Sequence, residues 1–226
     1  RHSDVTVITF LPRRRPAPPE GGHAPSPFVH KSLIKERAGI TPVGWFHAAD
    51  LGKSGPMAEF TFAPLTPASF LDRSAAVFAD RTAIVDGERR FTYRDMSGRC
   101  RRLGGALAGL GVGREDRVAA LCTNSHVMLE LHHAVPMLGA ALVPLNTRLS
   151  ADEMASLLAH SGTSVLVATH ELADRARQLA DRAGLPCFIA GGPDDSYEAW
   201  IEDAAEASPR PVDEDQMLAI NYTSGT

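Results

Sequence analysis

The sequence predicts an α/β fold built from βαβ units around a largely parallel sheet. Short apolar runs rich in Val, Ile, Leu and Ala alternate with segments whose apolar residues recur every three or four positions. Strands that alternate with helices are joined by crossover connections, which place neighbouring strands parallel to one another. The hydrophobic content of 44% is ordinary for a globular chain and supports a core.

Four apolar runs carry the strand predictions for this sheet, and each has the length of a buried strand. They cover residues 117–122, 141–145, 165–168 and 187–190. A hairpin is expected upstream of them, because Asp86-Gly87 separates two short extended stretches, 83–85 and 90–93, and Asp-Gly favours tight hairpin turns. A further apolar run, 217–220, is expected to be a buried strand that leads into the last turn of the chain.

Helices are expected where apolar residues recur at spacings of three and four. Thr92 and Asp95 have the spacing of a capping box, as do Ser150 and Glu153, so each pair is expected to begin a helix. Gly184 is expected to end another helix. The apolar stripes are Phe70, Leu71, Ala75 and Phe78; Met96, Cys100, Leu103, Leu107 and Leu110; Met154, Leu157 and Leu158; and Leu172, Ala176, Leu179 and Ala183.

Two more helices complete the alternation. Asn124 or Ser125 is expected to cap a helix after the 117–122 strand, because short polar side chains can accept hydrogen bonds from a free helix end. Residues 197–207 are expected to form an acidic helix. Strands and helices then alternate along the chain, as βαβ units require.

Residues 1–56 differ in kind from the rest of the chain. The stretch 11–20 is rich in Pro and Arg, and 21–27 continues without apolar periodicity. Such a segment buries too little apolar surface to offset its ordering entropy. The chain begins with Arg1, and Met57 precedes the first patterned segment. We therefore expect residues 1–56 to be a disordered or non-native extension. The apolar run at 5–11 is too short for a signal peptide.

The residues Tyr222-Thr223-Ser224-Gly225-Thr226 are the strongest candidate binding site. A strand that runs into a small, hydroxyl-rich turn suits a phosphate cradle, because Gly lets the backbone approach a ligand closely and turn N–H groups can form an anion-binding concavity. Ligands of parallel sheets bind beyond the carboxyl ends of the strands, where this turn is expected to lie. Thr, Ser and Gly are also common turn residues, so an ordinary polar turn stays open as an alternative.

Four stretches, in order along the chain, resemble motifs of the adenylate-forming enzymes. They are FTYRDM at 91–96, GVGREDRV at 111–118, PMLGAALVPLN at 136–146 and YTSGT at 222–226. This superfamily includes acyl-CoA synthetases, the adenylation domains of peptide synthetases and firefly luciferase. The resemblance identifies 57–226 as the N-terminal portion of an AMP-binding domain that ends inside its phosphate loop. The loop's Lys, the later motifs and the small C-terminal domain are absent from the 226 residues.

The resemblance implies an ATP-dependent carboxylate–CoA ligase. A fatty or aryl acid attacks the α-phosphate of ATP, which gives an acyl-adenylate and pyrophosphate, and CoA then displaces AMP. Thr223, Ser224, Gly225 and Thr226 would hold the ATP phosphates, while Mg²⁺ and the catalytic residues would be bound or supplied by missing parts, so this chain alone is expected to be inactive. An adenylation domain that loads a carrier protein, and a non-enzymatic α/β domain, remain alternatives.

Other motifs fit known sites poorly. Leu51-Gly52-Lys53-Ser54 resembles the end of a Walker A loop, but the earlier Gly is missing and no strand precedes it. Gly109-x-Gly111-x-Gly113 lacks the final Gly of a dinucleotide-binding fingerprint and is typical of a helix end and turn. His132-His133 lacks ligands at metal-binding spacing, which favours packing and surface roles.

Composition excludes several other classes of protein. The net charge of −4 gives no basic footprint for nucleic acid. No apolar run approaches the 18 or so residues that a membrane span needs. Cys100, Cys122 and Cys187 are far apart and odd in number, so we expect buried free thiols in a reducing, cytoplasmic compartment.

Overall fold

The computed structural model describes residues 5–8, 65–209 and 214–224. The expectation of a disordered or non-native extension at 1–56 therefore falls outside the described residues and stays a prediction, with one exception. The exception is β1 (Val5–Ile8), whose backbone pairs antiparallel with β8 (Asn221–Ser224).

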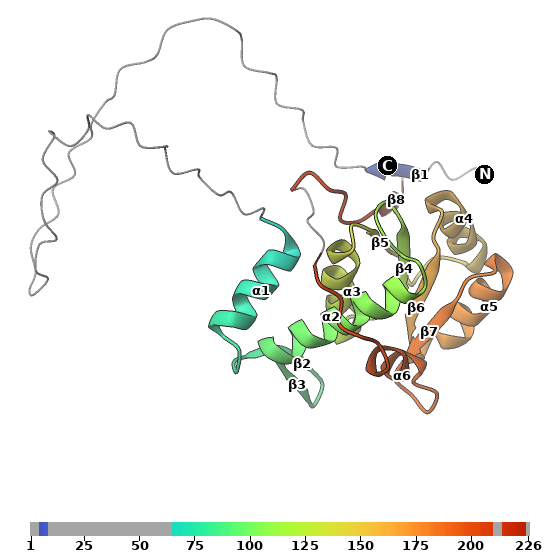
Figure 1. Cartoon of the computed structure of the whole chain (residues 1–226). Coiled ribbons are helices and arrows are strands. Elements are labelled where there is room, and N and C mark those ends of the chain that lie inside the picture. Colours follow the sequence, from blue (N-terminus) through green and yellow to red (C-terminus); the bar gives the residue numbers. More distant parts are fainter. Residues whose placement is uncertain (1–4, 9–64, 210–213, 225–226) are drawn as a thin grey trace, which may run out of the picture. The chain divides into compact units, whose positions relative to one another are not determined.

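A parallel sheet forms the centre of the fold, which confirms the predicted fold class (Figure 1). Its four strands run in the order β5-β4-β6-β7, and every neighbouring pair is parallel. Each strand lies within one residue of its predicted bounds. The strands are β4 (Arg117–Leu121), β5 (Ala141–Pro144), β6 (Val165–Thr169) and β7 (Cys187–Ala190).

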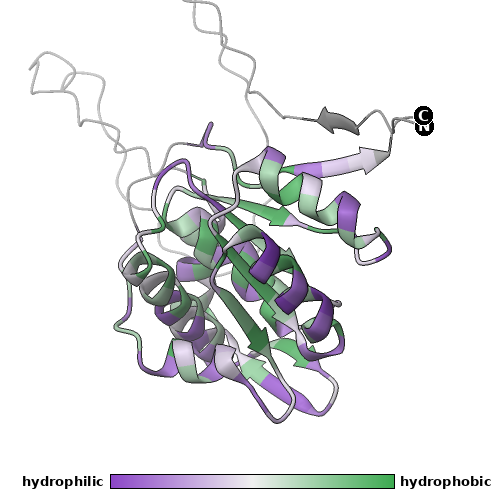
Figure 2. Cartoon of the chain, turned by 90° about the vertical axis from the view of Figure 1, so that its right-hand side faces the viewer, coloured by the Kyte–Doolittle hydropathy of each residue, from purple (hydrophilic) through white to green (hydrophobic). Residues whose placement is uncertain are grey.

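Helices cover both faces of this sheet, so its strands are buried on both sides. Within β4, Val118 and Ala120 contribute to one hydrophobic cluster, whereas Ala119 and Leu121 contribute to the other. Successive strand residues point to opposite faces, and this explains the division. Figure 2 shows hydrophobic strands between helices that carry hydrophilic residues on their outward faces. The continuous apolar runs in the sequence follow from this two-sided burial.

Each face of the sheet is covered by its own pair of helices. One face is covered by α2 (Tyr93–Gly109) and α3 (His126–Met137). The opposite face is covered by α4 (Ala151–Ser161) and α5 (Ala173–Ala183), the latter preceded by the 3-10 turn η2 (His170–Leu172). No helix among the described residues is long and apolar enough to cross a membrane.

The remaining elements pack against α2 and α3. Their buried residues extend the first cluster, and the last of these elements also contacts β7 of the sheet. They are α1 (Pro67–Val77), the antiparallel hairpin of β2 (Thr82–Asp86) and β3 (Arg89–Thr92), and α6 (Ser196–Glu202).

The predicted helix signals are confirmed at both capping boxes. Thr92 accepts a hydrogen bond from the Asp95 N–H at the start of α2, and Asp95 accepts from the Thr92 N–H in return. Ser150 and Glu153 do the same at the start of α4. Gly184 ends α5 with φ of 66°, a left-handed conformation that glycine adopts without a steric penalty.

Some expectations about α1 and α2 are wrong. Phe70 and Phe78 were expected on a buried stripe, but they are 51% and 48% exposed, and Ala68 with Leu71 forms the buried contact of α1. Leu110 is 45% exposed because α2 ends at Gly109 and Leu110 no longer follows the helical face.

Three local expectations are also corrected. The hairpin turn is Gly87-Glu88 rather than Asp86-Gly87, because Asp86 still pairs with Arg89 in the ladder. Ser125 stands at the cap of α3 but makes no side-chain bond to the helix, while Asp86 accepts the N–H of His126, the first helical residue. The helix expected over 197–207 ends at Glu202.

The chain after α6 lies directly on α2. The Ala207 N–H donates to the Arg101 carbonyl at 2.9 Å, and Arg102 pairs with Glu206 at 3.7 Å. A Cβ added to Gly105 would meet the Ala205 carbonyl oxygen at 1.7 Å. The contact between the two backbones therefore requires glycine at position 105.

Replacing Gly105 by Ala is expected to destabilise the chain by about 1–3 kcal/mol, because the added methyl group forces the 203–209 segment away from α2. Gly109→Ala is the matched control. Gly109 is also in α2, but nothing lies within 4 Å of its added Cβ, so this change is expected to be neutral or stabilising. Urea unfolding of both variants measures the difference. Equal stability of the two would show that the backbone contact is unimportant.

Candidate functional site

The segment before the predicted phosphate loop lies at the β5 edge of the sheet. The Leu142 N–H donates to the Leu218 carbonyl at 3.0 Å, and the Ile220 N–H donates to the Leu142 carbonyl at 2.8 Å, which is a parallel arrangement. The pairing is limited to one bridge, between Leu142 and Ala219. Met217 and Leu218 are each 42% exposed. The expectation of a buried strand over 217–220 is therefore wrong, because an edge segment is covered on fewer sides.

The next residues continue as strand β8 rather than as a turn. Thr223 and Ser224 pair with Thr6 and Val5 of β1, so their backbone groups are in an extended ladder. The Tyr222 hydroxyl lies 2.8 Å from His160 Nδ1 in the last turn of α4, and the two rings meet edge to face. Gly225 and Thr226 lie outside the described residues. The phosphate-binding role of 223–226 therefore stays a prediction.

The carboxyl ends of β4 and β6 meet where the order of strands changes direction. The chain runs from β4 outward to β5 and then returns across β4 to form β6. The Thr123 N–H donates to Thr169 Oγ1 at 3.2 Å, which ties the loop after β4 to the end of β6. Open parallel sheets bind ligands beyond the carboxyl ends of their strands at such a position.

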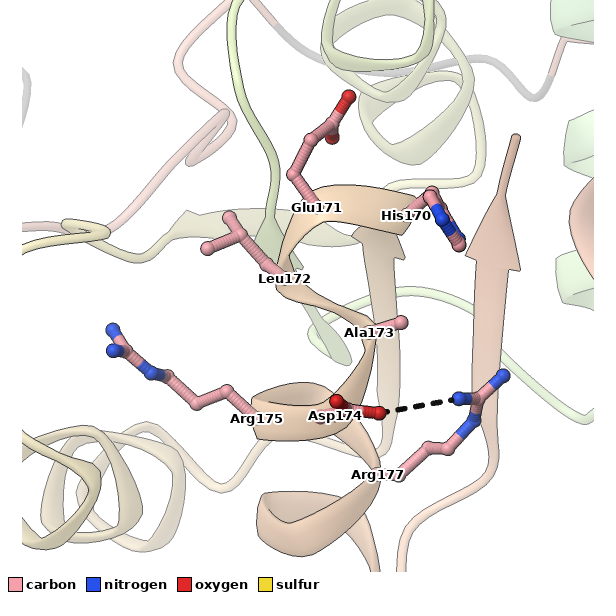
Figure 3. A pocket seen from close by; sticks show the side chains of 7 residues that line it. All are labelled: His170, Glu171, Leu172, Ala173, Asp174, Arg175 and Arg177. Carbon is pink, nitrogen blue, oxygen red and sulfur yellow. Dashed lines mark ion pairs between the residues drawn. The ribbon is translucent and has the colours of Figure 1, made fainter. Parts of the chain in front are cut away.

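A shallow hollow of about 440 Å³ lies after β6 at the start of α5 (Figure 3). Both of its arginines already have partners within the chain. Arg177 pairs with Asp174 at 3.6 Å and with Asp194 at 3.8 Å. Arg175 donates to the Thr147 carbonyl at 2.9 Å, in the loop after β5. These contacts connect the loops at the carboxyl edge to α5.

A buried polar cluster joins the hairpin to α2, α3 and α6. We call it the Arg99 cluster. Arg99 on α2 pairs with Glu130 on α3 at 2.5 Å and with Glu198 on α6 at 2.8 Å. Glu130 is completely buried and also accepts a hydrogen bond from the Tyr197 hydroxyl at 2.6 Å. The members of the Arg99 cluster are Asp86, Arg89, Arg99, His126, Glu130, Tyr197 and Glu198.

The pKa shifts in this cluster follow from burial and charge together. Burial alone would raise the pKa of Glu198, but hydrogen bonds from His126 and Arg99 hold it well below its usual range. Burial and the neighbouring Glu130 carboxylate raise the pKa of the Tyr197 hydroxyl well above its usual value, so this hydroxyl remains protonated and donates to Glu130. Burial opposes the charge of Arg99, but Glu198 and Glu130 raise its pKa above the usual value.

Sequence reasoning missed this cluster, although one signal for it is present. Glu130 lies on the apolar face of α3, between Val127 and Ala134, where a charged residue needs a buried partner. The identity of that partner could not be read from the sequence, because Arg99 and Glu198 come from distant elements.

The two histidines of the His132-His133 pair have the structural roles that the sequence favours. His132 Nδ1 lies 2.8 Å from the Met128 carbonyl one turn earlier, and His133 Nδ1 lies 3.3 Å from the Pro67 carbonyl of α1. The first contact lies within α3, and the second joins α3 to α1.

The cysteines are free thiols, as expected, but only two of them are buried. Cys100 and Cys122 are buried, whereas Cys187 is half-buried. Burial raises the pKa of Cys122 to about 12 and that of Cys187 to about 11, so both remain protonated thiols at neutral pH.

Comparison with known proteins places the sequence in a family. Residues 71–226 match the AMP-binding enzyme family. The chain belongs to this family. It is 36% identical to a peroxisomal acetate/butyrate–CoA ligase of Arabidopsis thaliana and 32% identical to a peroxisomal benzoate–CoA ligase of the same plant. These alignments cover 76% and 75% of this chain, and 34% and 33% of the relatives. The chain thus spans about a third of the length of the curated relatives it matches.

A solved structure agrees with this result. The fatty acyl CoA synthetase of Mycobacterium tuberculosis is 31% identical, with a TM-score of 0.60 over 70% of this chain and 32% of that one. The resemblance to adenylate-forming, acyl-CoA synthetase-like enzymes is confirmed. The cytoplasmic location stays a prediction, since both Arabidopsis relatives are named as peroxisomal.

Arg99→Met is expected to destabilise the chain by about 3–5 kcal/mol, because it leaves the buried Glu130 carboxylate without its cationic partner. Arg94→Met on the same helix is the matched control. Its ion pair with Asp80 is exposed on both sides, so the loss is expected to stay within about 1 kcal/mol. Urea unfolding of the two variants tests the difference, and equal losses would contradict the assigned role of Arg99.

Proposed function

We propose that this chain is the N-terminal portion of an ATP-dependent acid–CoA ligase that works through an acyl-adenylate. The match of residues 71–226 to the AMP-binding enzyme family carries this proposal. The acid–CoA ligases among its relatives support the reaction class. A carboxylate oxygen attacks the α-phosphorus of ATP and pyrophosphate leaves. The thiol of CoA then attacks the acyl carbon, and AMP leaves.

The loop 223–226 would hold the ATP phosphates that leave as pyrophosphate. Thr223, Ser224 and Thr226 supply hydroxyl donors, and Gly225 allows the backbone N–H groups to approach a phosphate oxygen. Such donors orient the leaving group and stabilise its charge. The pairing of Thr223 and Ser224 with β1 would have to open before the loop could close around phosphate.

Mg²⁺ is proposed as the partner of ATP, with protein ligands that lie outside the described residues. No group of three His, Cys, Asp or Glu side chains among them is placed to hold a metal ion. The proposal therefore assigns the metal ligands to other residues.

The acid is proposed to be a fatty or aryl carboxylic acid, because the relatives include ligases of both kinds. CoA is favoured over a carrier protein as the acceptor of the acyl group, since all three relatives compared above have CoA in their names. An adenylation domain that loads a carrier protein is the second candidate. Transfer of the acyl group to CoA, assayed beside transfer to a phosphopantetheinyl carrier protein, separates the two.

The 226-residue chain alone is expected to show no ATP–pyrophosphate exchange with acetate, butyrate, benzoate or long-chain fatty acids. It spans about a third of the length of its relatives. A protein that contains this chain at the relatives' full length is the positive control. Exchange by the chain alone would disprove the assignment of the chemistry to other parts.

In that full-length protein, Thr223→Val, Ser224→Ala and Thr226→Val are each expected to slow adenylation about ten- to a hundredfold. A hydrogen bond to a charged group contributes roughly 1.5–3 kcal/mol, and each variant removes one donor. The midpoint of thermal unfolding should change little, because each variant alters only a single hydroxyl group.

Thr82→Val is the matched control, because it removes the hydroxyl group of an exposed threonine in the β2–β3 hairpin, outside the loop. It is expected to leave kcat/KM for ATP unchanged. Unaltered adenylation in all three loop variants would remove the phosphate role from 223–226. Lowered stability with normal kinetics would favour the ordinary polar turn.

A further inference from the structure

His126 has a carboxylate on one ring nitrogen that fixes its orientation. Its Nδ1 lies 2.6 Å from Asp86 Oδ2, and the same oxygen accepts the His126 backbone N–H at 3.0 Å. Because an ionised carboxylate can only accept, Nδ1 carries a proton in both charge states of the ring. A change of charge therefore takes place at Nε2. The ring is 9% exposed and stacks on Phe91 with centroids 5.0 Å apart.

The two groups that face Nε2 favour opposite charge states. Arg89 Nη1 lies 3.4 Å away and can donate only to a neutral ring. Glu198 Oε1 lies 3.7 Å away and attracts a protonated ring. Arg89 also reaches the same Glu198 oxygen at 3.3 Å, so Arg89 and a protonated His126 compete for one acceptor.

The charges of the whole cluster favour the protonated ring. Three carboxylates belong to it, from Asp86 on β2, Glu130 on α3 and Glu198 on α6. Two guanidiniums oppose them, from Arg89 on β3 and Arg99 on α2. The cluster thus carries one excess negative charge while His126 is neutral, and it becomes neutral overall when His126 takes up a proton.

We propose that His126 is a pH-sensitive latch that holds the β2–β3 hairpin against α3 and α6. When protonated, it bridges Asp86 of the hairpin and Glu198 of α6 from its position at the start of α3. When neutral, it gives up its contact with Glu198 and leaves a net negative charge in a largely buried site. The hairpin then opens more readily.

The shift in pKa agrees with this geometry and gives the direction of the effect. Burial lowers the pKa of His126, but Glu198 and Asp86 outweigh burial and raise it above the usual value of about 6.5. A group whose pKa is raised by folding contributes fully below its unfolded pKa, and the contribution is lost as the pH rises through its folded pKa. The latch therefore loosens toward alkaline pH.

A cavity lies beside the latch, where opening of the hairpin would be felt first. It has a volume of about 290 Å³ and is lined by Asp86 and His126 together with Asn124 and Ser125 of the loop after β4. This loop reaches the meeting point of β4 and β6 through Thr123. Opening of the hairpin would change the wall of this cavity at the carboxyl end of β4.

Hydrogen exchange of the 226-residue chain from pH 6 to pH 9 tests the latch. Protection factors, corrected for the intrinsic pH dependence of exchange, are measured for the amides of the β2–β3 ladder and of β4 and β6. Hairpin protection is expected to fall as the pH rises, whereas sheet protection stays constant. Each pKa unit between closed and open hairpin corresponds to about a tenfold change in the opening equilibrium.

His126→Gln is expected to abolish the pH dependence of hairpin protection while the sheet amides remain protected. His132→Gln, on the exposed side of the same helix, is the matched control and should keep it. Hairpin protection that is constant from pH 6 to 9 in the unaltered chain would overturn the proposal, as would a pH dependence that survives in His126→Gln.

Glu198→Gln gives a second test, which holds even if His126→Gln does not fold. Loss of the Glu198 charge should lower the pKa of the His126 ring, followed by its NMR titration. The midpoint of hairpin opening should move to lower pH by the same amount. A midpoint that stays in place while the ring pKa moves would show that the hairpin does not depend on His126.

Discussion

The packing of one layer of this fold depends on the ion pairs of Arg99. The guanidinium contacts carboxylates from two other helices, and Glu130 has no exposure to water. A buried carboxylate without a cation would be very unfavourable, so α2 and α3 must assemble with Arg99 in place. Glu198 adds the short helix α6 to the same centre, and Arg89 adds the hairpin. These ion pairs therefore restrict the apolar cluster on this face of the sheet to one packing arrangement.

The opposite face of the sheet is built differently. Its cluster consists of apolar residues from α4, α5 and alternate positions of the four strands. Shape and hydrophobicity fix the packing there, whereas charge fixes it around Arg99. The contrast explains why substitutions on the two faces should have different consequences. A lost methylene opens a cavity on one face, and a lost partner leaves a buried charge on the other.

Most of the fold could be predicted from the sequence, because its signals are local. Capping boxes at Thr92 and Ser150 are formed by residues three apart, and each buried strand is a continuous apolar run. Errors arose where a distant group decided the outcome. Asp86, 40 positions away, accepts the first N–H of α3 whereas Ser125 makes no cap bond, and the edge position of Leu218 left it exposed. The Arg99 cluster contains hydrogen bonds between residues up to 109 positions apart, which no local pattern reveals.

The candidate phosphate loop shows the same limit. The small, hydroxyl-rich composition of 223–226 suggested a phosphate-binding role, and the chain's membership of the AMP-binding family supports that proposal. In the structure, however, Thr223 and Ser224 pair with β1. Extended backbone and a phosphate-binding turn are two conformations open to the same few small residues. The conformation adopted depends on whether β1 or a phosphate group accepts hydrogen bonds from the loop's N–H groups. Because that acceptor lies outside the loop, the loop's own sequence does not specify it.

Arg99 and Glu130 form a buried ion pair in which each partner makes the burial of the other's charge tolerable. A double-mutant cycle with Arg99→Met, Glu130→Gln and the two combined, followed by urea unfolding, tests this mutual dependence most directly. Because Glu130→Gln removes the unpaired charge that Arg99→Met leaves, the double variant is predicted to be more stable than Arg99→Met alone. Losses of stability that simply add would contradict the account.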